Sequence, residues 1–263
     1  MSYALITGAS SGIGRCYVNE MAARGYNIIA ISNQAEALIQ TQAEVERDYN
    51  VTVRCICIDL TERNAAHDIF ARCEAEAWEV EVLICNAGML LFSTLMRTEP
   101  ARLVKIIELH CITVTLLCRL FGQRMKERRK GGILLMSSST AWLPYPTISH
   151  YSATKSYIKN FAFALWYELH RYGVNVTAVF PGAVDTPLYN LEESMRRRFV
   201  RLGIMMRPEV IARRGVKALL RGRRRVTPGL FTKIVVAVCS LLPARALNIA
   251  LRLPIISRLL DRV

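Results

Sequence analysis

The stretch ALITGASSGIG, residues 4–14, decides the fold, because a short apolar run is followed at once by closely spaced glycines and then by a helical pattern. Glycines let a backbone turn tightly and approach a pyrophosphate, whose charge then meets the positive N-terminus of the following helix. The spacing therefore predicts a dinucleotide cradle, although a glycine turn with a purely structural role is the alternative. The residues expected to line the cradle are Gly8, Ser10, Ser11, Gly12, Ile13 and Gly14.

Beyond this stretch, short apolar runs alternate with longer segments of helical period, as in repeated βαβ units. Continuous apolar strands fit a parallel sheet that is covered by helices on both faces. The expected fold class is therefore α/β, a Rossmann-like doubly wound parallel sheet. Gly25, Gly131 and Gly173 follow three of the helices as expected left-handed C-caps. The expected strands are 4–7, 27–32, 52–58, 82–85, 132–136 and 175–180, and the expected helices are 13–24, 35–49, 64–78, 101–130 and 151–172.

The chain has 263 residues, of which 52% are hydrophobic, and can form one domain with a full core. We expect a catalytic domain over residues 1–229, with a substrate lid at about 187–206 and a short last strand and turn near 226–229. We expect residues 230–263 to form an apolar and basic helical extension of the same domain. This extension fits either a peripheral membrane contact or helices that close the substrate pocket or a subunit interface. Its apolar segment is too short to span a bilayer, and no secretory signal is evident at the N-terminus.

The formal net charge is +14, and arginines gather late in the chain, at 196–198, 201, 213, 214, 221 and 223–225. Such clusters attract nucleic acid, anionic lipid or a phosphorylated substrate, but solvated helix faces are the commoner explanation and no nucleic-acid motif accompanies them. The eight cysteines show no metal-ligand grouping and fit reduced core thiols of a cytosolic protein. We therefore expect no nucleic-acid partner, no metal and a cytoplasmic location.

Small and polar residues follow two later strands, at the edge where ligands bind in doubly wound sheets. Asn86, Ala87 and Gly88 come after the fourth strand, where Asn86 either ties neighbouring backbones together or is only a turn asparagine. Asp59, followed by Leu60, comes after the third strand. Its carboxylate can accept a hydrogen bond from an adenine amino group or cap the next helix.

The strongest local signal is YSATK, residues 151–155, at the expected start of a helix. Tyr151 and Lys155 are four residues apart, so the phenol and the ammonium share one helix face. A nearby cation stabilises the phenolate and lowers the tyrosine pKa, which proton transfer to a carbonyl oxygen requires. The preceding strand ends in MSSS, residues 136–139, and places a hydroxyl donor at the same edge of the sheet.

These motifs, in this order, resemble the short-chain dehydrogenase/reductase family over nearly all of residues 1 to about 230. The resemblance implies that Tyr151 exchanges a proton with the substrate oxygen while a nicotinamide exchanges hydride with its carbon. It also implies that Lys155 binds the nicotinamide ribose and lowers the tyrosine pKa. Ser138, which matches the family's serine position better than its neighbours, would hold the substrate oxygen. From PGAVDT, residues 181–186, the residues implied to flank the nicotinamide are Pro181, Gly182, Val184 and Thr186.

One position departs from the family pattern. The segment ELHC, residues 108–111, aligns with a segment where the family usually has asparagine, and that position is His110. The family's asparagine helps to hold a water that links the lysine to solvent. Imidazole donates and accepts hydrogen bonds near neutral pH, so His110 either keeps this proton path or is a tolerated substitution inside a helix.

Cofactor choice depends on the end of the second strand, which reads Ile31-Ser32-Asn33. It lacks the acidic residue that binds a ribose 2′-hydroxyl and repels a 2′-phosphate. NADP(H) is therefore expected in preference to NAD(H). Ser11 and Asn33 would be polar partners of the phosphate, with Arg15 nearby.

The apolar C-terminal segment favours a lipophilic ketone or secondary alcohol as substrate, such as a steroid, a lipid ketone or an acyl thioester. The pocket candidates, for which ordinary lid packing is the alternative, are Leu143, Tyr145, Ile148, Leu188 and Tyr189. The resemblance also implies a homodimer or homotetramer built on helices 101–130 and 151–172. An NAD(P)-binding scaffold or sensor with little turnover is the competing function, motivated by His110.

Overall fold

The computed structural model describes residues 2–90, 93–142, 147–186 and 192–241. Its strands form one parallel, seven-stranded sheet in the order β3-β2-β1-β4-β5-β6-β7. The strands are β1 (Tyr3–Thr7), β2 (Asn27–Ser32), β3 (Val53–Cys57), β4 (Val80–Cys85), β5 (Gly131–Met136), β6 (Val174–Val179) and β7 (Arg225–Val226). The order runs outward in opposite directions from β1 and β4, and ligands bind at such a switch point in open α/β sheets. The expected doubly wound fold is confirmed.

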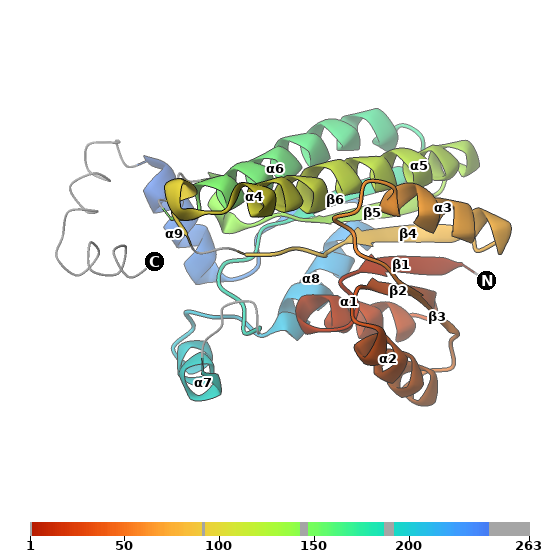
Figure 1. Ribbon diagram of the computed structural model, residues 1–263, viewed down its shortest axis with the longest axis horizontal. Coiled ribbons are helices and arrows are strands. Elements are labelled where there is room, and N and C mark those ends of the chain that lie inside the picture. Colours follow the sequence, from red (N-terminus) through yellow and green to blue (C-terminus); the bar gives the residue numbers. More distant parts are fainter. Residues whose placement is uncertain (1, 91–92, 143–146, 187–191, 242–263) are drawn as a thin grey trace.

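Helices cover both faces of the sheet (Figure 1). One layer contains α1 (Gly12–Ala22), α2 (Ala35–Asp48) and α8 (Pro208–Leu220). The other contains α3 (Ala65–Ala75), α4 (Pro100–Ile107), α5 (Thr113–Arg128) and α6 (Ser149–His170). The remaining elements at the carboxyl end of the sheet are η1 (Leu95–Arg97), the π turn η2 (Glu108–Ile112) and η3 (Ser139–Trp142), together with α7 (Glu193–Arg201) and α9 (Leu230–Leu241).

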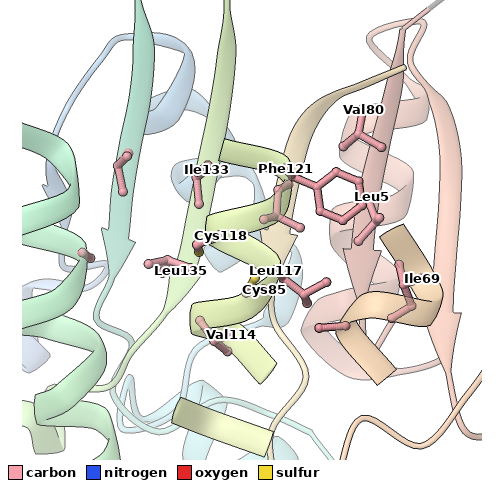
Figure 2. Close-up of a cluster of buried hydrophobic side chains, with 14 of the residues drawn as sticks. Leu5, Ile69, Val80, Cys85, Val114, Leu117, Cys118, Phe121, Ile133 and Leu135 are labelled. Atoms are coloured by element: carbon pink, nitrogen blue, oxygen red, sulfur yellow. The ribbon is translucent and has the colours of Figure 1, made fainter. Parts of the chain in front are cut away.

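Each face of the sheet has its own hydrophobic core. Successive side chains of a strand point to opposite faces, so Leu5 packs towards α3 and α5 whereas Ala4 and Ile6 pack towards α1 and α8. Figure 2 shows the first of these cores, where Phe121 of α5 and Ile69 of α3 lie over the sheet. Burial on both faces explains why the central strands are continuously apolar, whereas the edge strand β3 exposes Arg54 and Cys57.

The expected helix over residues 101–130 is interrupted. It consists of α4 and α5 joined by the π turn η2, which widens the helix for one turn at the level of His110. The left-handed residue after α5 is Arg129, with φ +55°, so the expected cap at Gly131 is wrong. Gly131 instead begins β5, where a Cβ atom would lie 2.5 Å from Cγ of Met125. Gly25 and Gly173 do have positive φ, as expected.

Helix α8 was not among the helices for which the sequence predicted bounds, because its arginines suggested only a solvated helix face. Its apolar residues Ile211, Ala212, Val216 and Leu219 are buried against α1 and the sheet, while its basic residues face outward. Pro208 at the start of the helix was the available signal. The short last strand β7 begins at Arg225, one residue before the strand and turn expected near 226–229.

The seven cysteines whose side chains the structure describes are all free thiols. Cys73, Cys85 and Cys118 are buried as expected. Cys57 is exposed because β3 is an edge strand, so the expectation of a core thiol is wrong for that residue. No helix within the described residues is long and apolar enough to cross a membrane.

Candidate active site

A cleft of about 400 Å³ lies at the carboxyl ends of the strands and brings most of the expected site residues together. Gly14, His110 and Ile148 are not among the described residues that line it. The pocket candidates Leu143, Tyr145, Leu188 and Tyr189 lie outside the part of the chain that the structure describes. The expected residues that do line the cleft are Gly8, Ser10, Ser11, Gly12, Ile13, Asn33, Asp59, Leu60, Asn86, Ala87, Gly88, Ser138, Tyr151, Lys155, Pro181, Gly182, Val184 and Thr186.

Several lining residues were missed from the sequence. Ser32 and Met136 are the last residues of β2 and β5, so their position at the carboxyl edge of the sheet was the available signal. Met89 and Leu109 come from two segments whose packing only the tertiary structure reveals. The full set of missed residues is Ser32, Gln34, Ile58, Thr61, Met89, Leu109, Met136 and Ser137.

The glycine turn after β1 leaves no room for side chains. A Cβ atom on Gly14 would overlap the carbonyl oxygen of Gly8, and a Cβ atom on Gly8 would lie 3.0 Å from Cα of Ala87. Gly8 and Gly12 also have φ values of +66° and +53°, which glycine adopts most readily. No described side chain caps α1, and its first turn contains no acidic residue. This helix N-terminus therefore fits a pyrophosphate.

Thr7 and Asn86 join the ends of β1 and β4. The hydroxyl of Thr7 accepts hydrogen bonds from the backbone N–H groups of Asn86 and Ala87, both at 3.0 Å. Nδ2 of Asn86 donates in return to the carbonyl oxygen of Thr7 at 3.1 Å. Asn86 thus ties neighbouring backbones together, as expected, and Thr7 is its partner.

Lys155 lies where the end of β5 and the start of α6 line the cleft, with only 5% of its surface exposed. Its Nζ donates to the carbonyl oxygen of Met136 at 3.0 Å and lies 5.5 Å from the ring centroid of Tyr151. Burial lowers the pKa of Lys155 from 10.5 to about 8. The expected pairing of phenol and ammonium on one face of α6 is therefore present.

The neighbouring serines have different hydrogen bonds. Ser137 donates its hydroxyl to the carbonyl oxygen of Lys155 at 2.8 Å, which fixes α6 against the end of β5. Ser138 Oγ accepts the N–H of Thr140 at 3.1 Å, so its own hydrogen remains to be donated into the cleft. These contacts favour Ser138 over Ser137 as the donor to a substrate oxygen.

His110 is 1% exposed and lies behind the cleft, in the π turn. Its Nε2 accepts the backbone N–H of Met89 at 3.1 Å, and its Nδ1 lies 2.9 Å from Oγ1 of Thr154. The Thr154 hydroxyl donates to the carbonyl oxygen of Tyr151 at 2.8 Å, so it accepts from Nδ1 of His110. This assignment leaves one proton, on Nδ1, and a neutral imidazole.

The electrostatic surroundings also favour the neutral imidazole. Burial is the main cause that holds the pKa of His110 well below its usual value, and the positive charge of Lys155 acts in the same direction. The His110 ring meets the Tyr151 ring edge to face, with centroids 5.7 Å apart. His110 therefore contacts Tyr151 through its ring, while its two nitrogens are engaged by Met89 and Thr154.

The part of the cleft beside the end of β2 is lined by neutral polar groups. Oγ of Ser10 and Oγ of Ser32 are 2.8 Å apart, and the Ser10 hydroxyl also lies within hydrogen-bonding distance of Gln34 Oε1, at 3.1 Å. Asn33, which lies between Ser32 and Gln34 in the sequence, is exposed. The cleft contains no acidic residue at the end of β2, as expected from the sequence.

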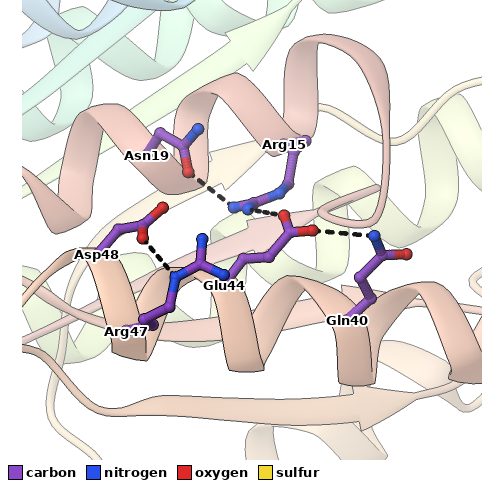
Figure 3. Close-up of polar contacts among 6 residues, drawn as sticks. All are labelled: Arg15, Asn19, Gln40, Glu44, Arg47 and Asp48. Carbon is purple, nitrogen blue, oxygen red and sulfur yellow. Dashed lines mark hydrogen bonds and ion pairs between the residues drawn. The ribbon is translucent and has the colours of Figure 1, made fainter.

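Arg15 is not among the residues that line the cleft. Figure 3 shows its guanidinium between α1 and α2, where it pairs with Glu44 at 2.7 Å and donates to Asn19 at 2.7 Å. This network, which Gln40 extends by donating to Glu44, directs Arg15 away from the position expected for a 2′-phosphate.

Asp59 lines the cleft after β3, and its Oδ1 accepts the backbone N–H of Thr61 at 2.9 Å. It therefore stabilises its own turn. The N-cap position of α3 is occupied by Asn64, so the alternative that Asp59 caps the next helix is wrong.

The described part of the expected lid, residues 192–206, is attached beside the loop that follows β6. Arg196 of α7 pairs with Asp185 at 3.0 Å, and a backbone bridge joins Val184 to Met206. No residue of α7 is buried, and Arg196 connects this helix to Asp185. Expected lid residues 192–206 are therefore close to the part of the cleft that Val184 and Thr186 line.

A family model, related sequences and solved structures match this chain. The family model for short chain dehydrogenases matches residues 2–197. The chain is 32% identical over 188 residues to mouse 17-beta-hydroxysteroid dehydrogenase type 3, covering 71% of this chain and 61% of that protein. It is also 32% identical over 197 residues to mouse very-long-chain 3-oxoacyl-CoA reductase, covering 73% and 62%. The chain thus spans about three fifths of the length of these relatives.

Solved structures with the same fold include a short-chain dehydrogenase from Sphingobium yanoikuyae in complex with NADPH, with a TM-score of 0.79, 24% identity and coverage of 93% of this chain and 97% of that one. A bulky-bulky ketone specific alcohol dehydrogenase from Comamonas testosteroni gives a TM-score of 0.77 at 23% identity, with coverage of 93% and 96%. At these identities the likeness supports the fold alone.

Proposed function

The chain belongs to the short-chain dehydrogenase family, and from this premise we propose that it is a nicotinamide-dependent reductase or dehydrogenase acting on the carbonyl or secondary alcohol carbon of an apolar substrate. The observation that carries the proposal is the buried Lys155 ammonium beside Tyr151, in the same cleft as the glycine turn. A structural lysine at this position would be costly, because burial disfavours its charged form.

The side chains at the catalytic end have distinct roles in this proposal. Tyr151 gives a proton to the substrate oxygen during reduction and takes it back during oxidation, while Ser138 donates a hydrogen bond to the same oxygen. The charge of Lys155 stabilises the phenolate form of Tyr151 and its Nζ binds the nicotinamide ribose. When bound, the nicotinamide supplies or accepts the hydride.

The residues proposed to hold the dinucleotide follow the cleft from end to end. The turn Gly8 to Gly14 and the N-terminus of α1 hold the pyrophosphate. Asp59 and Leu60 flank the adenine, and Asn86 to Gly88 support the ribose side. Pro181, Gly182, Val184 and Thr186 border the nicotinamide, and all four line the cleft.

For His110, the hydrogen bonds favour a positioning role over a proton path. A relay needs a nitrogen that exchanges its proton, but Nδ1 and Nε2 of His110 are held by Thr154 and Met89. We propose that His110 fixes the loop after β4 and the start of α6 relative to each other. Tyr151 and Lys155 then keep their separation.

The proposed substrate is an apolar ketone or alcohol of the steroid, lipid-ketone or acyl-thioester class. The names of the relatives, a hydroxysteroid dehydrogenase and a very-long-chain 3-oxoacyl-CoA reductase, support this range. Met89, Leu109 and Met136 contribute apolar surface to the cleft. Flexible methionine side chains adapt to varied apolar shapes.

NADP(H) is proposed as the preferred cofactor, with NAD(H) as the alternative. Support comes from the neutral residues Ser32, Asn33 and Gln34 at the end of β2, which would not repel a 2′-phosphate. Because Arg15 is engaged with Glu44, the proposed phosphate partners are hydroxyl and amide groups.

The decisive experiment is a panel of steroid, long-chain ketone and 3-oxoacyl thioester substrates with each cofactor, followed by absorbance at the nicotinamide band. We expect turnover with at least one apolar carbonyl, and loss of turnover in Tyr151→Phe. Cofactor binding without turnover on the whole panel would favour the scaffold function instead. Equal or tighter NAD(H) binding would overturn the cofactor preference.

A homodimer or homotetramer built on α5 and α6 is also proposed. Support comes from Ile112, Tyr157 and Tyr167, which are large side chains exposed on or beside these helices. Light scattering of wild type and Tyr157→Glu would test it, because a charge at the interface should favour the monomer.

We further propose a cytoplasmic location with peripheral membrane contact through the C-terminal extension.

A further inference from the structure

Helix α9 presents an apolar stripe to solvent. Leu230, Phe231, Ile234 and Val238 are between 53% and 74% exposed and lie on one face of the helix. On the opposite face, Thr232 is buried, and its Oγ1 would lie 2.5 Å from a Cβ atom on Gly182, a residue that lines the cleft. Helix α9 is thus fixed at the edge of the cleft with its apolar side outward.

Two further segments expose apolar side chains at the same end of the molecule. In η1 and α4, Met96 is 89% exposed and Val104 is 57% exposed. In the turn after α7, Leu202 is 63% exposed and Ile204 is 42% exposed. Figure 1 shows α4, α9 and, apart from them, α7 at the end of the molecule opposite the N-terminus, beyond the carboxyl ends of the strands.

The exposed apolar side chains are therefore concentrated around the mouth of the cleft. Eleven of the sixteen large hydrophobic side chains exposed within the described residues belong to residues 95–107, 195–204 or 230–238. We call these three segments the rim. Such a concentration on one face marks an interaction surface rather than scattered surface residues.

Cations accompany the apolar side chains of the rim. Arg97, Arg102, Lys105, Arg201 and Lys233 are exposed there, and none has an ion pair within the described residues. The sequence that continues from α9, residues 242–263, contains four arginines and a single acidic residue. Apolar side chains flanked by cations are typical of surfaces that insert into the headgroup region of an anionic bilayer.

We propose that the rim docks on an anionic lipid bilayer, so that the mouth of the cleft faces the membrane. This inference rests on the proposed function, because it explains how an apolar substrate would reach the cleft without crossing water. A second copy of the chain is a less suitable partner for the rim, because a symmetric contact would bring the cations of the two copies together.

The test is flotation of the full chain with vesicles of phosphatidylcholine containing roughly one third phosphatidylglycerol. The wild type should float with these vesicles and much less with phosphatidylcholine alone. Leu230→Ser and Phe231→Ser should each lower vesicle partitioning by about tenfold, because each removes a large side chain from the apolar layer. Lys105→Glu should lower the partitioning onto anionic vesicles relative to wild type and leave the partitioning onto phosphatidylcholine vesicles unchanged.

Matched controls lie at the other end of the sheet. Leu220, which is 51% exposed, is the last residue of α8, and the exposed Arg221 follows it. Leu220→Ser and Arg221→Glu should float as the wild type does. Equal flotation of Phe231→Ser and wild type, or equal loss in Leu220→Ser, would overturn the proposal, as would a wild type that does not bind vesicles. Concentration-dependent dimers that Phe231→Ser abolishes, without vesicle binding, would make the rim an interface between copies.

A kinetic arm separates this inference from the proposed function. Reduction of a small water-soluble ketone should be the same in wild type and Phe231→Ser. Reduction of a long-chain ketone dissolved in anionic vesicles should be lower in Phe231→Ser, by about the factor lost in binding. Equal rates in the vesicle assay would overturn the docking proposal and leave the reductase intact, whereas no reduction in either assay would overturn the reductase.

Discussion

The two ends of the cleft are built differently. At the catalytic end, buried polar groups are held by several hydrogen bonds: Lys155 by Met136, and His110 by Met89 and Thr154. At the end proposed to bind the adenosine, the residues at and beside the end of β2 are neutral: Ser32 is buried, Ser10 is half-buried and Gln34 is exposed.

This difference separates chemistry from cofactor selection. A buried charge is costly unless the surrounding structure holds it, so the catalytic end tolerates few substitutions. Neutral hydroxyl and amide groups discriminate weakly between a ribose hydroxyl and a phosphate. The adenosine end should therefore be easy to change without loss of the fold.

The largest effect is expected from Tyr151→Phe, which removes the proton donor and leaves the ring. The kcat of carbonyl reduction should fall by about 10³-fold, the usual contribution of a positioned acid or base. Tyr157→Phe is the matched control on the same helix, because it loses only a hydrogen bond to Thr115. Steady-state kinetics would measure both, and a similar loss in the two variants would contradict the assignment of Tyr151.

A second large effect concerns Lys155 and pH. The folded-state pKa is about 8, below the ordinary 10.5 of an unfolded lysine, so between these values the unfolded chain binds more protons and the free energy of unfolding rises with pH. Relative to Lys155→Met, the wild type should gain on the order of 3 kcal/mol across this window. Denaturant titrations at pH 7.5 and 10.5 would measure it, with exposed Lys217→Met as a control that shows no such gain.

Replacement of His110 should have an intermediate effect. His110→Leu leaves the Met89 N–H without its acceptor, so the free energy of unfolding should fall by about 2 kcal/mol and kcat by about tenfold. His110→Asn can restore a hydrogen bond and should recover part of both. Because the imidazole is already neutral, the pH–rate profile between pH 5 and 8 should keep its shape in both variants. A titration near pH 6 that is present in the wild type and absent from His110→Leu would instead support the proton path.

The smallest effect is expected at the adenosine end. Asn33→Asp places a carboxylate where the 2′-phosphate is proposed to bind, so KM for NADPH should rise about tenfold while KM for NADH stays or falls. Arg15→Leu should change KM for NADPH by less than about twofold, because Arg15 pairs with Glu44 at the surface. A larger loss in Arg15→Leu than in Asn33→Asp would show that Arg15 does reach the phosphate.

The sequence predicted the parts of the molecule whose residue types follow from local rules. The glycine turn depends on backbone conformation and space, which only glycine provides at Gly8 and Gly14. The pairing of Tyr151 with Lys155 follows from helix periodicity. By contrast, the bounds of α8 were missed because only its packing against α1 shows which face of the helix is buried. The π turn at His110 has no sequence signature of its own.

By itself the sequence determined the alternating α/β order, the dinucleotide turn and the candidate proton donor, because each is set by residues close together along the chain. Only the tertiary structure decided which partners those residues meet. Thr154 and Met89 fix the proton of His110, Glu44 holds Arg15 away from the cleft, and α9 packs its threonine on Gly182 with its apolar face outward. Hydrogen bonds and burial between distant segments depend on how the helices pack on the sheet, and no local pattern encodes that packing.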